Sequence, residues 1–469
     1  MKVAFGKVNL TPKDYIGKAM AGYTRTKPCL GKLDDIYAYG ILIENKELHN
    51  NSNRLLLIST DLLKIPLSVS NYIKERIQQF MPINPEQILI HATHTHSSFD
   101  LTGEFYWQGG VLNVMKGVMF GANRNDKYLV WMTKEIVKMV SQLVKDLIPC
   151  KIAWTKKQID ENIIINRRHP TRRSKSDLGV IAFRNLKDNN LIGIIINFSC
   201  HPTTLSFLNN KLSADFPGRI VFKIQKLTKE RVNAVFFNSY AGDLNPITTC
   251  GTDFENLNNN KTLIYDQLGT YKHTKEIGYF LGKQALHLAQ SIPHVDYFEI
   301  VELDFYIKDF WIPMKDFKYF SKTWLKNKLL FLLKKYLLIP VTIISGKNPN
   351  FSAFHIKYKG LKAKCNTIIQ YLEIKASSEL KSKTLGIITA PGELFEEIGK
   401  NLLKKSPIGK ENTFIFQNSN DWISYLFPTK EYIEVGGYEP FPSFSPVSGV
   451  YVEKEILKLF EEIKNKIFK

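Results

Sequence analysis

Short apolar runs alternate with longer amphipathic segments along most of the chain, and this alternation predicts strands followed by helices. The runs that we interpret as strands are residues 54–60, 88–92, 179–184, 191–198, 234–238 and 385–388. The helical segments are 68–80, 127–147, 218–227 and 277–290, the first two of which we expect Pro82 and Pro149 to end. The pattern therefore predicts an α/β fold with mixed β-sheets and flanking helices, and functional side chains where strands meet loops.

Residues 317–338 depart from this pattern because six lysines alternate with large apolar and aromatic side chains, with no acidic residue among them. A basic amphipathic helix of this kind can lie in the plane of an anionic membrane surface. A helix that packs on the domain and leaves its lysines in water would have the same composition. Both interpretations stay open.

The formal net charge of +20 over 469 residues indicates an anionic partner, either a membrane surface or a nucleic acid. A lysine-rich codon bias explains the charge equally well. Nucleic acid is the less favoured partner, since the chain has no paired CxxC motif and no aromatic RNA-binding signature.

The five cysteines are scattered and indicate no disulfide framework. The first residues lack the apolar core of a secretory signal, and no apolar stretch is long enough to cross a bilayer. We therefore expect a cytoplasmic protein, with a peripheral position at the membrane as a further possibility.

Five of the ten histidines fall between His91 and His201, and three of them lie in one heptapeptide. If the preceding strand continues, its alternation places His94 and His96 on one side. Imidazole is a common zinc ligand and titrates near neutral pH, so the pair indicates a metal or acid–base site. Histidines that are simply hydrogen-bonded in a polar loop are the alternative, and we favour the site.

Other potential ligands also follow predicted strands. His201 comes after the strand at 191–198, and Glu393 comes after the strand at 385–388. Each is weak evidence alone, because a glutamate that begins a helix usually complements the helix dipole.

Taken together and in order, these motifs resemble the neutral (non-lysosomal) ceramidase family. The matching stretches are Val-Asn-Leu-Thr-Pro at 8–12, Met-Ala-Gly-Tyr at 20–23, Ser-Thr-Asp-Leu at 59–62, Ala-Thr-His-Thr-His-Ser at 92–97, Ile-Asn-Arg at 165–167, the strand before His201, Leu-Ser-Ala-Asp-Phe-Pro-Gly at 212–218, Ala-Gly-Asp-Leu at 241–244, Pro-Gly-Glu at 391–393 and the segment 424–437. They cover nearly the whole chain. The histidine motif is the most specific of them.

The resemblance implies a single catalytic domain over residues 1–469, without the C-terminal β-sandwich domain of full-length ceramidases. It implies a zinc-dependent hydrolase with a lipid-like N-acyl substrate, ceramide above all, which the family cleaves to sphingosine and a fatty acid. The implied ligands of Zn²⁺ are His94, His201, Glu393 and Tyr425. The implied catalytic residues are His96 for proton transfer, Arg167 for the carbonyl or a substrate hydroxyl, Tyr432 for the oxyanion, and Asn245.

The chain departs from the family at two places near the implied site. The family continues the histidine motif with Gly-Pro and more glycine, whereas this chain continues with Ser97-Ser98-Phe99-Asp100, and Asn245 stands where the family has a serine. An amide hydrogen-bonds but cannot act as a hydroxyl. Hydrolysis of a different small amide, ester or peptide is therefore an alternative. A basic membrane- or nucleic-acid-binding relative without activity is another, which the retention of all four implied ligands disfavours.

Overall fold

The computed structural model describes most of the chain. The described residues are 1–23, 25–45, 54–103, 105, 124–159, 163–171, 174–247, 269–313, 355–359, 362–379, 381–435, 439, 443 and 445–467. The basic segment 317–338 lies outside them, so its contact with a membrane stays a prediction. Among the described residues, no helix has the length and apolar character needed to span a bilayer.

The larger sheet has eight strands in the order β11-β9-β8-β6-β1-β3-β4-β5. Their bounds are Asn233–Asn238, Leu191–Phe198, Ser176–Asn185, Ile148–Ile159, Lys2–Asn9, Tyr37–Glu44, Arg54–Thr60 and Ile88–Ala92, in that order. The outermost pair at each edge is parallel, and the other pairs are antiparallel. Strands β1 and β6 pair only at Lys2 with Pro149 and Val3 with Ile148, so two four-stranded halves join at one end.

Helices cover both halves of this sheet. Helices α1 (Leu67–Gln78) and α3 (Asp126–Leu143) pack on the half that contains β1 and β3, while α4 (Asp215–Thr228) and α6 (Tyr271–Ser291) pack on the half that contains β8 and β11. Side-chain alternation divides the core accordingly. Leu42, Leu56 and Ile58 belong to the apolar cluster under α1 and α3. Their strand neighbours Ile41 and Leu57 point the other way and belong to the other large apolar cluster of the protein.

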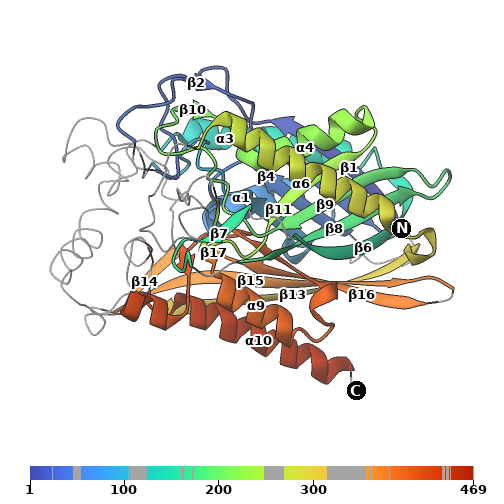
Figure 1. Cartoon of the computed structure of the whole chain (residues 1–469). Helices are drawn as coiled ribbons and strands as arrows, with labels where there is room; N and C mark the ends of the chain where they lie inside the picture. The colour runs from blue at the N-terminus through green and yellow to red at the C-terminus, as the bar shows by residue number, and fades with distance from the viewer. Residues whose placement is uncertain are drawn as a thin grey trace.

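A second, five-stranded sheet lies below the first in Figure 1, with two helices on its outer face. Its strands are β13 (Ile300–Pro313), β14 (His355–Lys359), β15 (Lys362–Ser377), β16 (Ser382–Ala390) and β18 (Thr413–Gln417), and the helices are α9 (Glu396–Lys405) and α10 (Ser448–Ile467). Only β16 and β18 pair in parallel.

Three two-stranded ladders lie outside the two sheets. They are β2 (Gly31–Lys32) with β10 (Lys211–Leu212), β7 (Ile164–Asn166) with β12 (Leu244–Pro246), and β17 (Glu393–Leu394) with β19 (Tyr425–Leu426). The short helical turns are η1 (Pro85–Gln87), η2 (His294–Asp296), η6 (Lys410–Asn412) and the π-helix η7 (Glu431–Val435).

The predicted α/β class with mixed sheets is confirmed. Strands 54–60, 88–92 and 191–198 have the predicted bounds. The helix predicted at 127–147 ends earlier, at Leu143, and Pro149 lies in β6 instead of ending the helix. The pattern did not predict β1, β3, β6, β13 or β15. Whether the chain is a single domain stays a prediction.

His91 joins the two sheets where β5, β11 and β18 approach one another. Its Nδ1 lies 2.8 Å from the carbonyl oxygen of Gln417, and its Nε2 lies 3.1 Å from the backbone nitrogen of Asn238. The carbonyl can only accept, so Nδ1 carries the proton and Nε2 accepts from Asn238. Burial lowers the pKa of His91 to about 3, so the ring is neutral at physiological pH and this tautomer persists.

We predict that His91→Leu destabilises the protein strongly. The substitution introduces an apolar side chain of similar size but leaves the buried N–H of Asn238 without its partner, at a cost of about 1–3 kcal/mol. It also removes one donor from the buried Gln417 carbonyl, which still accepts from the Ser419 hydroxyl at 3.2 Å, at a further cost of about 1 kcal/mol. The free energy of unfolding in urea should fall by about 2–5 kcal/mol.

His287→Leu is the matched control, because His287 is exposed on α6 and its replacement should change stability by less than about 0.5 kcal/mol. Equal stabilities of the two variants would show that His91 does not join the sheets.

Candidate metal centre

The predicted ligands follow the carboxyl ends of strands in both sheets. His94 comes two residues after β5, and His201 comes three residues after β9. Glu393 begins β17, three residues after β16, and its register partner in β19 is Tyr425. The two sheets therefore bring together the side chains of His94, His201 and Glu393, which are far apart in sequence, and the backbone of Tyr425 pairs with that of Glu393.

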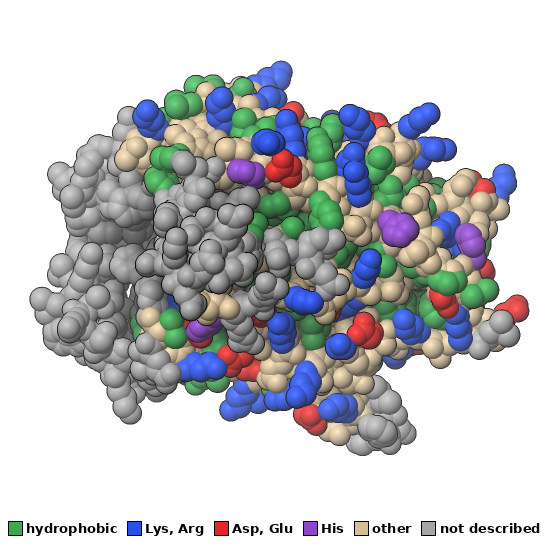
Figure 2. All heavy atoms as spheres, in the orientation of Figure 1, with side chains coloured by type: hydrophobic (Ala, Val, Ile, Leu, Met, Phe, Trp, Pro, Cys, Tyr) green, Lys and Arg blue, Asp and Glu red, His purple; other side chains and the backbone are tan. Residues whose placement is uncertain are grey.

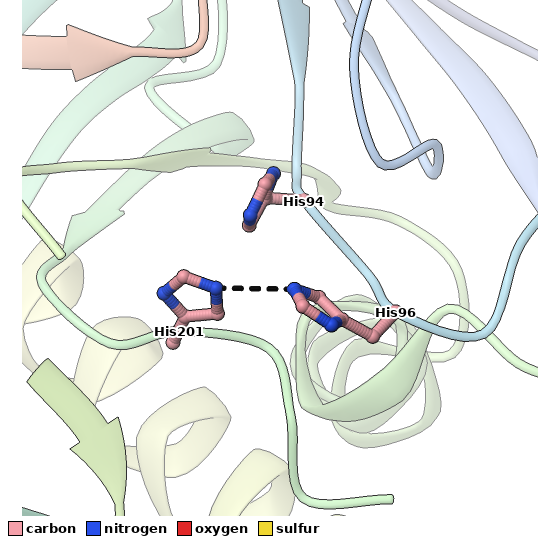
Figure 3. Close-up of side chains that lie close together, drawn as sticks. All are labelled: His94, His96 and His201. Atoms are coloured by element: carbon pink, nitrogen blue, oxygen red, sulfur yellow. Dashed lines mark hydrogen bonds between the residues drawn. The ribbon is translucent and has the colours of Figure 1, made fainter. Parts of the chain in front are cut away.

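Three histidine rings converge at this point (Figure 3). His94, His96 and His201 are buried, and each offers a ring nitrogen within 4.8 Å of those of the other two. Nε2 of His96 lies 3.1 Å from Nε2 of His201. Among the described residues, these three make up the group of His, Cys, Asp and Glu side chains that could hold a metal ion.

The two histidines of the heptapeptide converge for a different reason from the one predicted. Strand β5 ends at Ala92, so strand alternation does not extend to His94. His94 has φ of 73°, in the left-handed region, and the chain turns there. A non-glycine residue in this conformation is strained, and such strain concentrates at functional sites.

Backbone carbonyls fix the tautomers of His94 and His201. Nδ1 of His94 lies 2.6 Å from the carbonyl oxygen of Leu63, and Nδ1 of His201 lies 2.9 Å from that of Ala241. Since a carbonyl only accepts, both Nδ1 atoms carry the proton. In the neutral imidazole, which is the form that binds a metal, Nε2 is then unprotonated and presents a lone pair.

The carboxylate of Glu393 faces these lone pairs. Its Oε2 lies 3.3 Å from Nε2 of His94 and 3.6 Å from Nε2 of His201, while its Oε1 accepts from Nε1 of Trp422 at 3.2 Å. Oε2 of Glu393 and Nε2 of His94 are buried and make no hydrogen bond with the residues that the structure describes. Two acceptors that face each other without water are unfavourable unless a cation lies between them.

The spacing of these atoms suits zinc. Ligands that lie about 2.0–2.1 Å from a tetrahedral ion are separated from one another by about 3.3–3.4 Å. The two Glu393 distances, 3.3 and 3.6 Å, are close to that separation. The residues present therefore fit a small divalent cation with nitrogen and oxygen ligands.

The charges of these groups also suit a cation. Burial lowers the pKa of His201 to about 3 and holds the pKa of His96 well below its usual value. Burial would raise the pKa of Glu393, but His94, His201 and Arg167 outweigh it and lower that pKa. At neutral pH the site thus combines the neutral imidazoles of His96 and His201 with an ionised carboxylate.

Two glycines let the loops of the site approach closely. A Cβ on Gly242 would lie 2.4 Å from the carbonyl oxygen of Glu393, and one on Gly392 would lie 2.3 Å from that of Ser424. The backbone N–H of Gly242 donates to the carbonyl of Leu394 at 2.8 Å. Larger residues would displace these loops, and with them Glu393 and its neighbour Tyr425.

Arg167 and Asn245 lie together beside Tyr425. One terminal nitrogen of Arg167 donates to the Asn245 side-chain oxygen at 2.7 Å, and the other donates to the Gly242 carbonyl at 2.6 Å. Its Nε donates to Glu439 at 2.8 Å, and its guanidinium lies 5.4 Å from the centre of the Tyr425 ring. Although burial opposes it, Tyr425 and Glu439 raise the pKa of Arg167, so the side chain stays charged.

Tyr432 lies at the edge of this group. It is half-buried, its ring centre is 5.6 Å from that of Phe427, and it packs on the cluster of Phe395, Tyr425 and Phe427. Burial raises the pKa of its hydroxyl, which therefore remains protonated.

Several residues that support the histidines were not predicted from the sequence. Tyr23 places its ring centre 4.6 Å from that of His96, and Arg25 donates to the His96 carbonyl at 2.6 Å. Gly22 has φ of 92°, and a Cβ there would lie 2.5 Å from the His96 ring. The matching motif at 20–23 was the sequence signal that could have identified them, because its glycine and its tyrosine suit close packing against another ring.

No family model and no curated protein matches this chain. Among solved structures, a neutral ceramidase from Pseudomonas aeruginosa is similar with a TM-score of 0.70 and 17% identity, covering 99% of this chain and 74% of that one. A ceramidase complexed with C2 is similar with a TM-score of 0.69 and 16% identity, covering 99% of this chain and 75% of that one. The chain therefore has a neutral ceramidase-like fold.

Proposed function

We propose that the protein is a zinc-dependent hydrolase that cleaves an N-acyl amide bond, with ceramide as the leading substrate. The observation that carries the metal is the buried pair of acceptors, Glu393 Oε2 and His94 Nε2, that face each other at 3.3 Å. The ceramidase-like fold supports the choice of substrate.

In this proposal His94, His201, Glu393 and Tyr425 hold Zn²⁺. When bound, zinc lowers the pKa of a coordinated water and polarises a carbonyl. The carbonyls of Leu63 and Ala241 orient the two imidazoles, and Trp422 orients the carboxylate. Such partners are typical of catalytic metal sites, because they fix ring orientation and ligand basicity.

His96 is the residue that we propose to move a proton between the attacking water and the leaving amine. Its Nε2 is directed at His201, and its Nδ1 is buried without a hydrogen-bond partner among the described residues. Because His96 belongs to the same histidine cluster, a third-ligand role is the alternative that an experiment must separate.

Arg167, Asn245 and Tyr432 would bind the substrate around the scissile bond. Arg167 orients the Asn245 amide, so the pair offers polar groups to a head-group hydroxyl or to the carbonyl. The protonated hydroxyl of Tyr432 is suited to donate to the developing oxyanion.

A second candidate is zinc-dependent hydrolysis of another small amide, ester or peptide. The observation that favours it is Asn245, which replaces the family serine and accepts a hydrogen bond from Arg167. The head group of the substrate can therefore differ while the metal chemistry persists.

We predict that the purified protein binds about one zinc per chain and that His94→Ala or His201→Ala removes most of it, because each substitution removes a ligand that water replaces poorly. Plasma emission spectroscopy after dialysis measures the content. Stoichiometric zinc in the His94→Ala/His201→Ala double variant would reject the ligand assignment.

His96→Ala is the matched comparison in that series. It should keep its zinc while turnover falls by about 10²–10⁴-fold, as expected on loss of a proton-transfer group. If His96→Ala loses zinc and His94→Ala retains it, the two roles are reversed.

A substrate panel tests the bond that is cleaved. We predict zinc-dependent release of fatty acid from an N-acyl lipid, with ceramide in detergent as the first substrate, and loss of that activity in His94→Ala. Mass spectrometry of the products measures it. A zinc-loaded protein that cleaves only soluble esters or peptides would instead establish the second candidate.

A further inference from the structure

Four large apolar side chains lie exposed on two neighbouring loop regions. Ile16 is 58% exposed, Leu30 55%, Phe207 40% and Leu208 57%. Among the large hydrophobic residues that the structure describes, only Val295 is more exposed than Ile16, Leu30 and Leu208. We refer to these four residues as the apolar patch.

Backbone hydrogen bonds hold the segments of the patch side by side. Gly17 donates to the Cys29 carbonyl at 2.8 Å, which places Ile16 beside Leu30. Leu30 donates to the Asn210 carbonyl at 2.7 Å, and β2 continues this contact with β10. The exposed apolar side chains therefore belong to one surface.

Basic side chains surround the patch. The lysines on these segments are Lys13, Lys18, Lys27, Lys32 and Lys211. The acidic residues on the same surface are Asp14, which pairs with Lys18 at 2.9 Å, and Asp35, which pairs with Lys32 at 2.6 Å. The surface thus keeps a positive balance. Figure 2 shows apolar and basic side chains interleaved at the top of the molecule, where Figure 1 places β2 and β10.

Hydrogen bonds connect the segments of the patch directly to the loop that carries His94 and His96, which we call the histidine loop. The Asn209 side chain donates to the Ser97 hydroxyl at 3.0 Å, and Ser213 donates to the Ser97 carbonyl at 2.9 Å. Arg25 connects the same elements, because it donates to the carbonyls of Asn209 at 2.8 Å and His96 at 2.6 Å. A surface bound at the patch would therefore lie close to the metal centre.

We propose that the apolar patch and its lysines bind the surface of an anionic lipid bilayer. Exposed large apolar side chains that insert at the interface, combined with lysines that reach anionic head groups, are the two contributions by which peripheral proteins bind membranes. An uncharged partner would gain nothing from the lysines. A soluble anionic partner would leave the apolar side chains in water.

No residue of the patch belongs to the segment 317–338, and the proposal does not depend on the proposed hydrolysis, since lipid binding is measured without turnover. It would bring a lipid substrate to the histidine loop if the proposed function holds.

Co-sedimentation with vesicles tests the proposal. The wild-type protein should bind vesicles of phosphatidylserine and phosphatidylcholine, and binding should weaken with salt and without phosphatidylserine. Leu30→Ser/Leu208→Ser should lower the partition coefficient by about tenfold through loss of apolar insertion. Lys27→Glu/Lys211→Glu should lower it by at least about as much through reversed charge.

Val295→Ser is the control, since Val295 is 76% exposed but lies outside the patch, in η2. It should bind vesicles like the wild type, and zinc content with near-ultraviolet circular dichroism should show that every variant is folded. Wild-type binding by both double variants would overturn the proposal and assign any vesicle binding to another segment. Patch variants that change only self-association in sedimentation velocity would also overturn it, in favour of a contact between two copies.

Discussion

The two hydrogen bonds of the buried His91 ring hold together the carboxyl ends of strands from both sheets. One nitrogen donates to the Gln417 carbonyl that ends β18, and the other accepts from Asn238 at the end of β11. His91 itself lies in β5, three residues before His94. Because each strand leads directly into a loop of the site, the position of this ring determines where those loops begin.

The loops then create an electrostatic requirement. As neutral imidazoles, His94 and His201 present lone pairs, because backbone carbonyls accept from their other nitrogens, and Glu393 presents a carboxylate oxygen to both. All three groups are buried, so water cannot screen their mutual repulsion. A bound cation resolves this conflict, and the strained φ of His94 and Ser424 is consistent with a site in which the fold imposes the geometry.

The sequence predicted the fold class because it depends on local patterns, whereas the grouping of His201 with His94 and His96 came from the resemblance to the ceramidase family. Apolar runs marked strands 88–92 and 191–198 with the observed bounds, and His94, His96 and His201 follow them closely. The long strands β1, β6 and β13 were not predicted because polar and charged residues interrupt their apolar positions, and Pro149 was misread as a helix end.

The supporting contacts could not be predicted because they depend on distant backbone. Nothing near residue 94 in the sequence indicates that Leu63 orients His94, and nothing near residue 393 indicates the Trp422 hydrogen bond. The contact of Arg167 with Asn245 requires the pairing of β7 with β12, which brings together residues 78 positions apart. Such contacts follow from topology and register.

Anomalous diffraction at the zinc absorption edge tests the central claim most directly. From crystals of the zinc-loaded protein, the account predicts one strong peak about 2.0–2.2 Å from Nε2 of His94, Nε2 of His201 and Oε2 of Glu393. A zinc-saturated crystal without a peak between these three atoms would contradict it.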